Sequence, residues 1–113
     1  MEVIKAALSG VPVLKVMGDL DHLTAPALET AVGDVLSADG MRLLLDLTDC
    51  PYLDSGGLSV LLYAVREVRG KGWIGVIAPS HNLFRLFEIT GLTVAPDFRV
   101  FSDSDQAMEA LAG

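Results

Sequence analysis

Residues 51–62 (PYLDSGGLSVLL) constrain the fold of this chain more than any other stretch. They follow residues 42–47 (RLLLDL), an apolar run of strand length. After them, apolar residues recur at the spacing of one helical face, at Leu58, Leu61, Leu62 and Val65. The passage between these two patterns, residues 54–57, is therefore predicted to be a strand-to-helix junction.

The chemistry of this junction favours an anion. Asp54 and Ser55 are both strong candidates for a helix N-cap, because their side-chain oxygens can accept hydrogen bonds from the unpaired amides of the first turn. Gly56 and Gly57 leave those amides sterically open. The helix N-terminus also carries the positive end of the macrodipole, so we expect a phosphate on the Ser55 hydroxyl to be tolerated without unfolding.

Size and charge narrow the class of protein. With 113 residues and 12.0 kDa, the chain is expected to form one domain over residues 1–113. Hydrophobic residues make up 51% of it, which predicts a large core with some apolar surface left for a partner. The net charge of −7 argues against nucleic acid or an anionic membrane as the main partner, because both require a basic patch.

Cysteine content and hydropathy indicate a cytoplasmic protein. The single cysteine, Cys50, excludes an internal disulfide and any multi-cysteine metal site, and it fits a reducing compartment. No apolar stretch reaches the ~20 residues that a membrane span needs. The first ten residues, MEVIKAALSG, lack the long apolar region of a signal peptide.

The N-terminal part is predicted to contain a β-hairpin and a helix. Residues 3–8 and 11–17 have strand patterns, and the turn pair Ser9-Gly10 separates them. Thr24 is the expected N-cap of a helix that ends near Asp39-Gly40. Leu23 and Leu28 are expected to form a hydrophobic staple at its start.

The part after the junction should continue the alternation of strands and helices. The helix that begins near Ser55 is expected to end near Val68, and Pro79-Ser80 is expected to stop the next strand and cap the next helix. Gly91 has the position of a C-terminal glycine cap. The remaining expected elements are a strand at 73–78, a helix at 81–90, a strand at 98–101 and a helix at 103–111 opened by Ser102 or Asp103.

The predicted order β-β-α-β-α-β-α-β-α is that of an α/β fold. Its sheet should be mixed and mostly parallel, with an antiparallel hairpin at the N-terminus and right-handed crossovers. In such sheets the working surface usually lies at the carboxyl ends of the strands. Residues 19–22 and 50–57 both follow strand ends, so we expect these two segments to face the same way.

Three segments of the chain form a specific pattern when they are taken together: residues 18–25 (GDLDHLTA), residues 45–47 (LDL) running into 52–58 (YLDSGGL), and Thr90-Gly91-Leu92. With this pattern the chain resembles STAS-domain anti-sigma factor antagonists of bacteria. The resemblance covers essentially the whole length. It implies a STAS fold without enzymatic activity or a cofactor.

The resemblance also implies a switch. In this family the serine after the motif aspartate is phosphorylated by a partner that is both anti-sigma factor and serine kinase. The unphosphorylated form binds that partner and frees the sigma factor. A serine phosphatase is expected to remove the phosphate and restore the binding form. Carried over, Ser55 is the phosphoacceptor, and Asp21, Asp54, Ser55, Gly56 and Gly57 form the partner-binding site. Where many relatives have a second serine or alanine, this chain has Gly56, which is expected to free the loop slightly.

Other interpretations stay open at this level. Ser55 alone is more often a plain helix cap, and Asp21 and Asp54 are as often turn or capping carboxylates. A non-switching STAS scaffold of a lipid-transport ABC complex or a stressosome-like particle is the alternative function. An esterase using His22 or His81 is disfavoured because the G-x-S-x-G elbow is absent, and one cysteine with two isolated histidines does not indicate a metal site. In the third helix, an exposed Phe84 or Leu83 would be an interface anchor.

Overall fold

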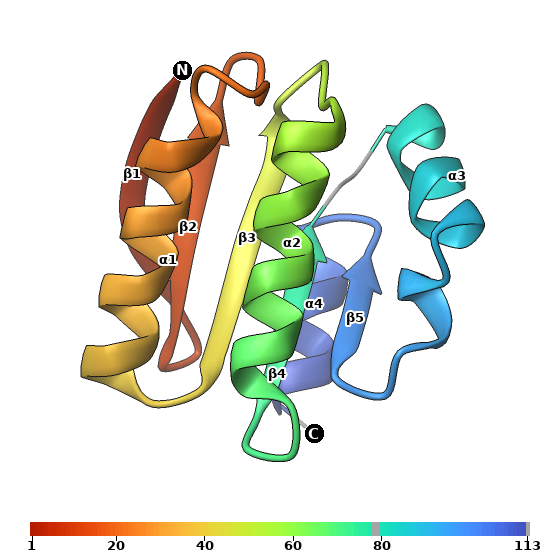
Figure 1. The fold of residues 1–113 in the computed structure, drawn as a ribbon. Coiled ribbons are helices and arrows are strands. Elements are labelled where there is room, and N and C mark those ends of the chain that lie inside the picture. The colour runs from red at the N-terminus through yellow and green to blue at the C-terminus, as the bar shows by residue number, and fades with distance from the viewer. Residues whose placement is uncertain (78–79, 113) are drawn as a thin grey trace.

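The computed structural model describes residues 1–77 and 80–112, apart from the side chain of Asp39. These residues form a five-stranded sheet in the order β1-β2-β3-β4-β5 (Figure 1). The strands are β1 Glu2–Leu8, β2 Val11–Met17, β3 Arg42–Asp49, β4 Trp73–Ile77 and β5 Phe98–Phe101. The helices are α1 Ala25–Asp39, α2 Ser55–Val68, α3 His81–Ile89 and α4 Ser104–Ala112, with a 3₁₀ turn η1 at Leu92–Val94.

The order of elements and the strand directions confirm the predicted fold class. β1 and β2 are antiparallel, whereas β2, β3, β4 and β5 pair in parallel. In Figure 1, α1 and α2 cover one face of the sheet, α4 covers the other, and α3 lies beyond the β5 edge. The chain therefore crosses from strand to strand through helices, as the alternating apolar patterns indicated.

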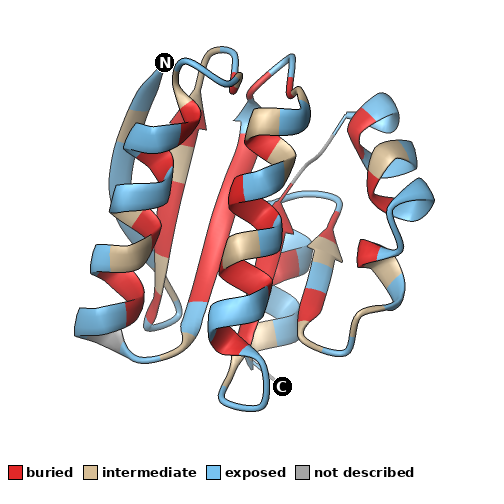
Figure 2. Cartoon of the chain, viewed as in Figure 1, coloured by how far each residue is buried: buried red, intermediate tan, exposed pale blue. Residues whose placement is uncertain are grey.

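The core lies on both faces of the sheet, and β3 is its centre. All residues of β3 from Leu43 to Leu47 are buried, which explains the near-continuous apolar run there (Figure 2). The larger cluster packs the sheet against α1 and α2, and a smaller one includes Leu44, Trp73 and Ala107 of α4. Among the described residues, no helix has both the length and the apolar character of a membrane span.

Several element boundaries differ from the prediction. β3 continues to Asp49 because β2 and β3 shift register between Lys15 and Met17, so that Met17 pairs with Asp49. At α4, by contrast, the prediction that Ser102 or Asp103 opens the helix is confirmed for Asp103, whose carboxylate accepts a hydrogen bond from the Gln106 amide at 2.7 Å. The turn η1 was not predicted. The predicted end of β4 at Ala78 and the stop at Pro79 lie outside the described residues.

The start of α3 and its end agree with the prediction. Ser80 caps the helix by accepting a hydrogen bond from the Leu83 amide at 3.2 Å. After the helix, Gly91 takes the left-handed conformation with φ of 81°, and Leu92 behind it is buried. Leu83 is a core residue, whereas Phe84 is 36% exposed and stays a candidate contact residue.

The predicted start of α1 is wrong in two details. Leu23 does not staple to Leu28, because Leu23 is 78% exposed and Leu28 is fully buried. The side chain of Thr24 does not cap the helix either. Its hydroxyl accepts a hydrogen bond from the Asp21 amide at 2.9 Å instead. The Thr24 hydroxyl therefore stabilises the preceding loop rather than the first turn of α1.

Candidate functional site

Two loops lie side by side at the carboxyl ends of β2 and β3. Residues 18–24 connect β2 to α1, and residues 50–54 connect β3 to α2, both at the top of Figure 1. The Leu20 amide donates to the Tyr52 carbonyl at 2.9 Å, and the Asp54 amide donates to the Leu20 carbonyl at 3.2 Å. A parallel bridge between Leu20 and Leu53 extends the pairing of the strands into the loops. The expectation that the two loops face the same way is therefore confirmed.

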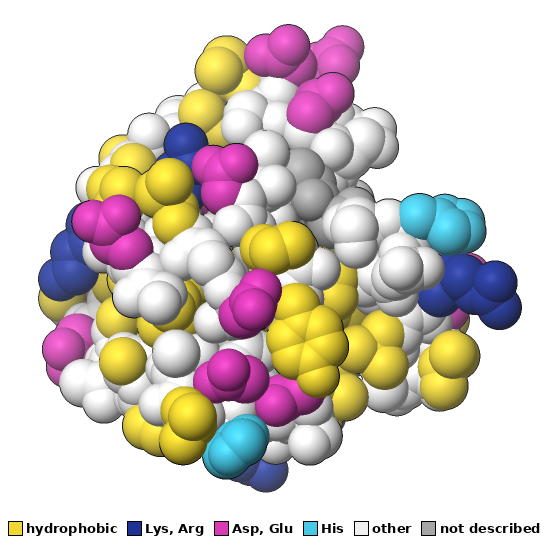
Figure 3. Space-filling view, turned by 90° about the horizontal axis from the view of Figure 1, so that it is seen from above, with side chains coloured by type: hydrophobic (Ala, Val, Ile, Leu, Met, Phe, Trp, Pro, Cys, Tyr) yellow, Lys and Arg dark blue, Asp and Glu magenta, His cyan; other side chains and the backbone are white. Residues whose placement is uncertain are grey.

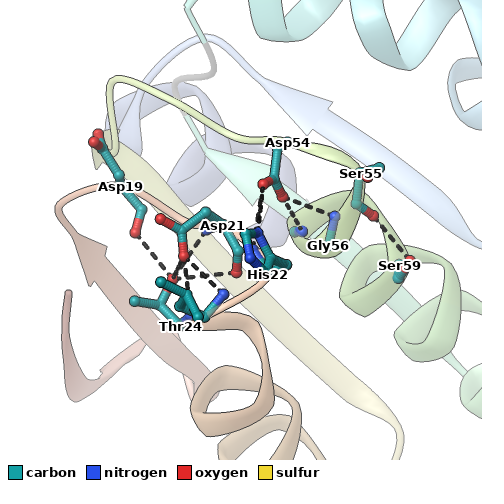
Figure 4. A network of polar contacts seen from close by, with 10 residues as sticks. Asp19, Asp21, His22, Thr24, Asp54, Ser55, Gly56 and Ser59 are labelled. Atoms are coloured by element: carbon teal, nitrogen blue, oxygen red, sulfur yellow. Dashed lines mark hydrogen bonds and ion pairs between the residues drawn. The ribbon is translucent and has the colours of Figure 1, made fainter.

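The carboxylate of Asp54 joins the two loops and caps α2. Its Oδ1 accepts hydrogen bonds from the amides of Gly56 at 2.7 Å and Gly57 at 3.3 Å. Its Oδ2 accepts from the amide of His22 at 3.3 Å and lies 3.6 Å from His22 Nδ1 (Figure 4). One oxygen of the Asp54 carboxylate thus caps the helix, and the other binds the neighbouring loop.

Asp21 holds the shape of its own loop. Its Oδ1 accepts hydrogen bonds from the amides of Leu23 at 2.9 Å and Thr24 at 3.0 Å, and from the Thr24 hydroxyl at 3.2 Å. The interpretation of Asp21 as a turn carboxylate therefore accounts for one of its oxygens. The side chain is only partly buried, which leaves the residue accessible to a partner.

Hydrogen bonding keeps both carboxylates ionised. For Asp54, partial burial would raise the pKa, but the hydrogen bonds from the amides of Gly57, Gly56 and His22 outweigh it and lower the pKa. For Asp21, the hydrogen bond from the Thr24 amide is the largest cause of a lowered pKa, opposed by desolvation. The negative charge of Asp54 also raises the pKa of Asp21, but by less than the hydrogen bonds lower it.

Loss of these charges is expected to destabilise the fold at acid pH. A carboxylate whose pKa is lowered in the folded state stabilises that state above its unfolded value, which is 3.8 here, and loses this contribution as pH falls through the folded pKa. Denaturant midpoints should therefore change little from about pH 7 to pH 5 and fall below about pH 4.

Asp54→Asn tests this dependence, because an amide oxygen can still accept the capping bonds but does not titrate. The variant should be less stable than wild type at neutral pH, because it lacks the charge and its NH₂ group cannot accept the hydrogen bond from the His22 amide, and it should lose less stability on acidification. An equal loss in both proteins would show that Asp54 does not contribute to the pH dependence.

Ser55 is the first residue of α2 and is exposed. Asp54 occupies the cap position, so the interpretation of Ser55 as a plain N-cap does not describe this helix. Its carbonyl accepts a hydrogen bond from the Ser59 hydroxyl at 2.9 Å. Among the described residues, nothing forms a hydrogen bond with the Ser55 hydroxyl, which leaves that group free at the positive end of the helix.

Gly56 does not free the loop as expected, because it lies against the neighbouring one. A Cβ atom on Gly56 would lie 2.6 Å from the Cα and 2.8 Å from the backbone nitrogen of His22. At Gly57, a Cβ atom would lie 2.8 Å from the Leu20 carbonyl oxygen. Both glycines are thus needed because the two loops approach each other closely, and all five predicted site residues lie in this contact or next to it.

His22 and two apolar side chains belong to the same surface but were not predicted as partner contacts. His22 links the loops through Asp54, and Leu23 and Tyr52 are 78% and 54% exposed. Seen from above, acidic and hydrophobic side chains lie together near the middle of this face (Figure 3). A large apolar residue within a polar loop segment, such as Leu23 in residues 18–24, is the sequence signal that indicates such a surface.

In the described part of the chain, the candidate groups for metal binding and for nucleophilic catalysis are poorly placed. No group of three His, Cys, Asp or Glu side chains there could hold a metal ion. Cys50 is buried, and desolvation raises the pKa of its thiol, which makes it a poor nucleophile. His81 lies at the start of α3, on a different element from the two loops.

Comparison with known proteins agrees with the resemblance noted in the sequence. A protein-family model described as "Mlab, STAS domain" matches residues 5–99. The anti-sigma-F factor antagonist RsfB of Mycobacterium tuberculosis is 32% identical over 105 residues, which cover 93% of this chain and 84% of RsfB. The anti-sigma-B factor antagonist of Listeria monocytogenes is 39% identical over 79 residues, or 69% of each chain.

A solved structure extends the agreement to three dimensions. The crystal structure of an anti-sigma factor antagonist from Mycobacterium paratuberculosis is 30% identical, has a TM-score of 0.84, and covers 99% of this chain and 94% of that one. These relatives are regulators rather than enzymes, in agreement with the prediction of a non-enzymatic protein. This chain belongs to the STAS-domain family of anti-sigma factor antagonists.

Proposed function

We propose that this protein is an anti-sigma factor antagonist that is switched off by phosphorylation of Ser55. In the unphosphorylated form it binds an anti-sigma factor that is also a serine kinase, and this binding frees the sigma factor. The observation that carries the proposal is the exposed Ser55 hydroxyl at the first position of α2, directly after the Asp54 cap. The names of the related antagonists support the choice of partner.

A phosphate on Ser55 is compatible with the fold. The group adds about −1.5 to −2 charges, and the first turn of a helix favours an anion through the helix dipole. Asp54 already satisfies the amides of Gly56 and Gly57, so α2 does not depend on the Ser55 side chain for its cap. Phosphorylation should therefore act on binding rather than on folding.

The same phosphate opposes binding. It would add negative charge beside Asp54 and Asp21 at the centre of the contact, where a partner must desolvate it. If burial of that unpaired charge costs about 3 kcal/mol, affinity falls on the order of a hundredfold. A change of that size is sufficient for a switch between partners.

The proposal implies a cycle in the cytoplasm. The kinase phosphorylates Ser55 and releases the antagonist, and a serine phosphatase restores the binding form. Residues 1–113 act as one STAS domain in this cycle.

The direct test is capture of the anti-sigma factor by the protein before and after incubation with ATP: capture should occur without ATP and be lost as phosphate accumulates. Capture that does not depend on phosphorylation would contradict the switch.

Asp21→Asn should weaken either partner binding or the rate of phosphorylation. The amide can still accept hydrogen bonds from the Leu23 and Thr24 amides through its oxygen, so the loop should keep its shape. The change removes one negative charge near Ser55, and we expect a loss of about five- to tenfold in one of the two quantities. Unchanged affinity and rate would leave Asp21 as a turn residue alone.

A second candidate is a STAS subunit that scaffolds a larger assembly, such as a lipid-transport ABC complex or a stressosome-like particle, without modification of Ser55. The match to a family model with the description "Mlab, STAS domain" is the observation that favours it. The co-purifying protein distinguishes the two candidates. An ATP-binding, kinase-like subunit supports the switch, whereas transporter subunits support the scaffold.

A further inference from the structure

Two large apolar side chains, Leu23 and Tyr52, are exposed on the loops that form the candidate site. We call the surface formed by residues 18–24 and 48–55 the loop face. Leu23 and Tyr52 on this face are 78% and 54% exposed, values that are unfavourable for large apolar side chains in water. Neither residue contributes to the core of the described chain.

These two residues are held by hydrogen bonds rather than being on loose segments. The Leu23 amide donates to Asp21 Oδ1 at 2.9 Å, and the Tyr52 carbonyl accepts from the Leu20 amide at 2.9 Å. Because these bonds hold the backbone of both residues in place, little backbone entropy is lost on binding, which favours a strong interface.

The side chains of the loop face carry mainly negative charge, and His22 lies beside Asp54. Residues 18–24 (GDLDHLT) and 48–55 (TDCPYLDS) contain Asp19, Asp21, Asp49 and Asp54 and no lysine or arginine. The side chain of Asp19 is exposed, and Figure 3 shows acidic side chains close to hydrophobic ones on this face. A second copy of the chain is a poor occupant, because a two-fold contact through this face would bring the same carboxylates together.

We propose that Leu23 and Tyr52 are the apolar anchors of the partner contact and that the anti-sigma factor meets them with an apolar centre surrounded by arginine or lysine side chains. This inference rests on the proposed function and specifies the chemistry of its partner. The carboxylates of the loop face then steer association and select a basic surface, and the two apolar side chains supply most of the buried contact.

The test measures the affinity of the whole chain for the isolated anti-sigma factor without ATP. Leu23→Ser should reduce affinity about tenfold or more, and Tyr52→Ser should have a similar effect. Ile89→Ser is the matched control, because Ile89 on α3 has the same exposure of 78% and lies outside the loop face. The control should bind within about twofold of wild type, and all three variants should keep the wild-type unfolding temperature, since these side chains add little to the core.

Salt dependence tests the electrostatic half of the proposal. Affinity should fall steadily as salt rises from about 50 to 500 mM, and Asp19→Asn should make the slope shallower. If Leu23→Ser binds as tightly as Ile89→Ser, or if salt leaves the affinity unchanged, the inference is overturned. A switch that still depends on Ser55 would survive that result, whereas failure of the wild-type protein to bind any anti-sigma factor would overturn both proposals.

Discussion

Ser55→Glu is expected to reduce binding to the anti-sigma factor at least about tenfold while leaving the fold intact. The substitution places a permanent negative charge at the first position of α2, next to Asp54, in the centre of the proposed contact. Because an acidic side chain is favourable in the first turn of a helix, the unfolding temperature should stay within about 2 °C of wild type. Calorimetric titration and thermal unfolding of the same samples measure the two quantities.

Ser37→Glu is the control for added charge. Ser37 is exposed near the end of α1, at the opposite end of the helix layer from the two loops (Figure 1). This variant should bind like wild type. Loss of folding in Ser55→Glu would assign a structural role to Ser55, and equal loss of binding in both variants would mean that net charge, rather than position, controls the interaction.

Gly56→Ala should produce the largest loss of stability among single changes in the site. The new methyl group would lie within 3 Å of two backbone atoms of His22, and backbone cannot move aside as a flexible side chain can. The β2–α1 loop must shift, at a cost of about 1–3 kcal/mol, or roughly 4–13 °C in unfolding temperature. Partner binding should weaken as well, because the shift separates Asp21 and Leu23 from Ser55.

Gly33→Ala provides the comparison within a helix. A Cβ atom on Gly33 in α1 would have the Tyr63 hydroxyl, the end of a flexible side chain, as its nearest neighbour at 3.1 Å. Alanine is favoured over glycine in a helix interior by about 1 kcal/mol, so this variant should be neutral or more stable. A Gly56→Ala protein as stable as Gly33→Ala would show that the two loops are not as closely packed as described.

The junction at the start of α2 could be predicted because its determinants are local. The apolar run before residue 51, the capping Asp54 and the helical spacing from Leu58 onward lie within a short stretch of chain. The same holds for the glycine cap at Gly91 and for the alternation of strands and helices that gives the parallel sheet. Fold class and the position of Ser55 follow from patterns of this kind.

The contact between the loops could not be predicted, because it joins residues that are distant in sequence. His22 and Asp54 are 32 residues apart, and only the parallel pairing of β2 with β3 brings them together. No local pattern shows that Gly56 is required by the backbone of His22. For Leu23, two local interactions were possible. The Asp21 carboxylate accepts hydrogen bonds from the Leu23 and Thr24 amides, and this fixes the turn before the helix begins in place of the staple.

The central claim is tested most directly by locating the phosphate. The wild-type protein, Ser55→Ala and Ser59→Ala are incubated with the cognate anti-sigma kinase and ATP, and the modified residue is identified by mass spectrometry. Ser59 is the matched control, because it is exposed and its hydroxyl bonds to the Ser55 carbonyl one turn away. The account predicts a single phosphate on Ser55 in the wild type and in Ser59→Ala, and none in Ser55→Ala. A phosphate on another residue, or on Ser55→Ala, would contradict it.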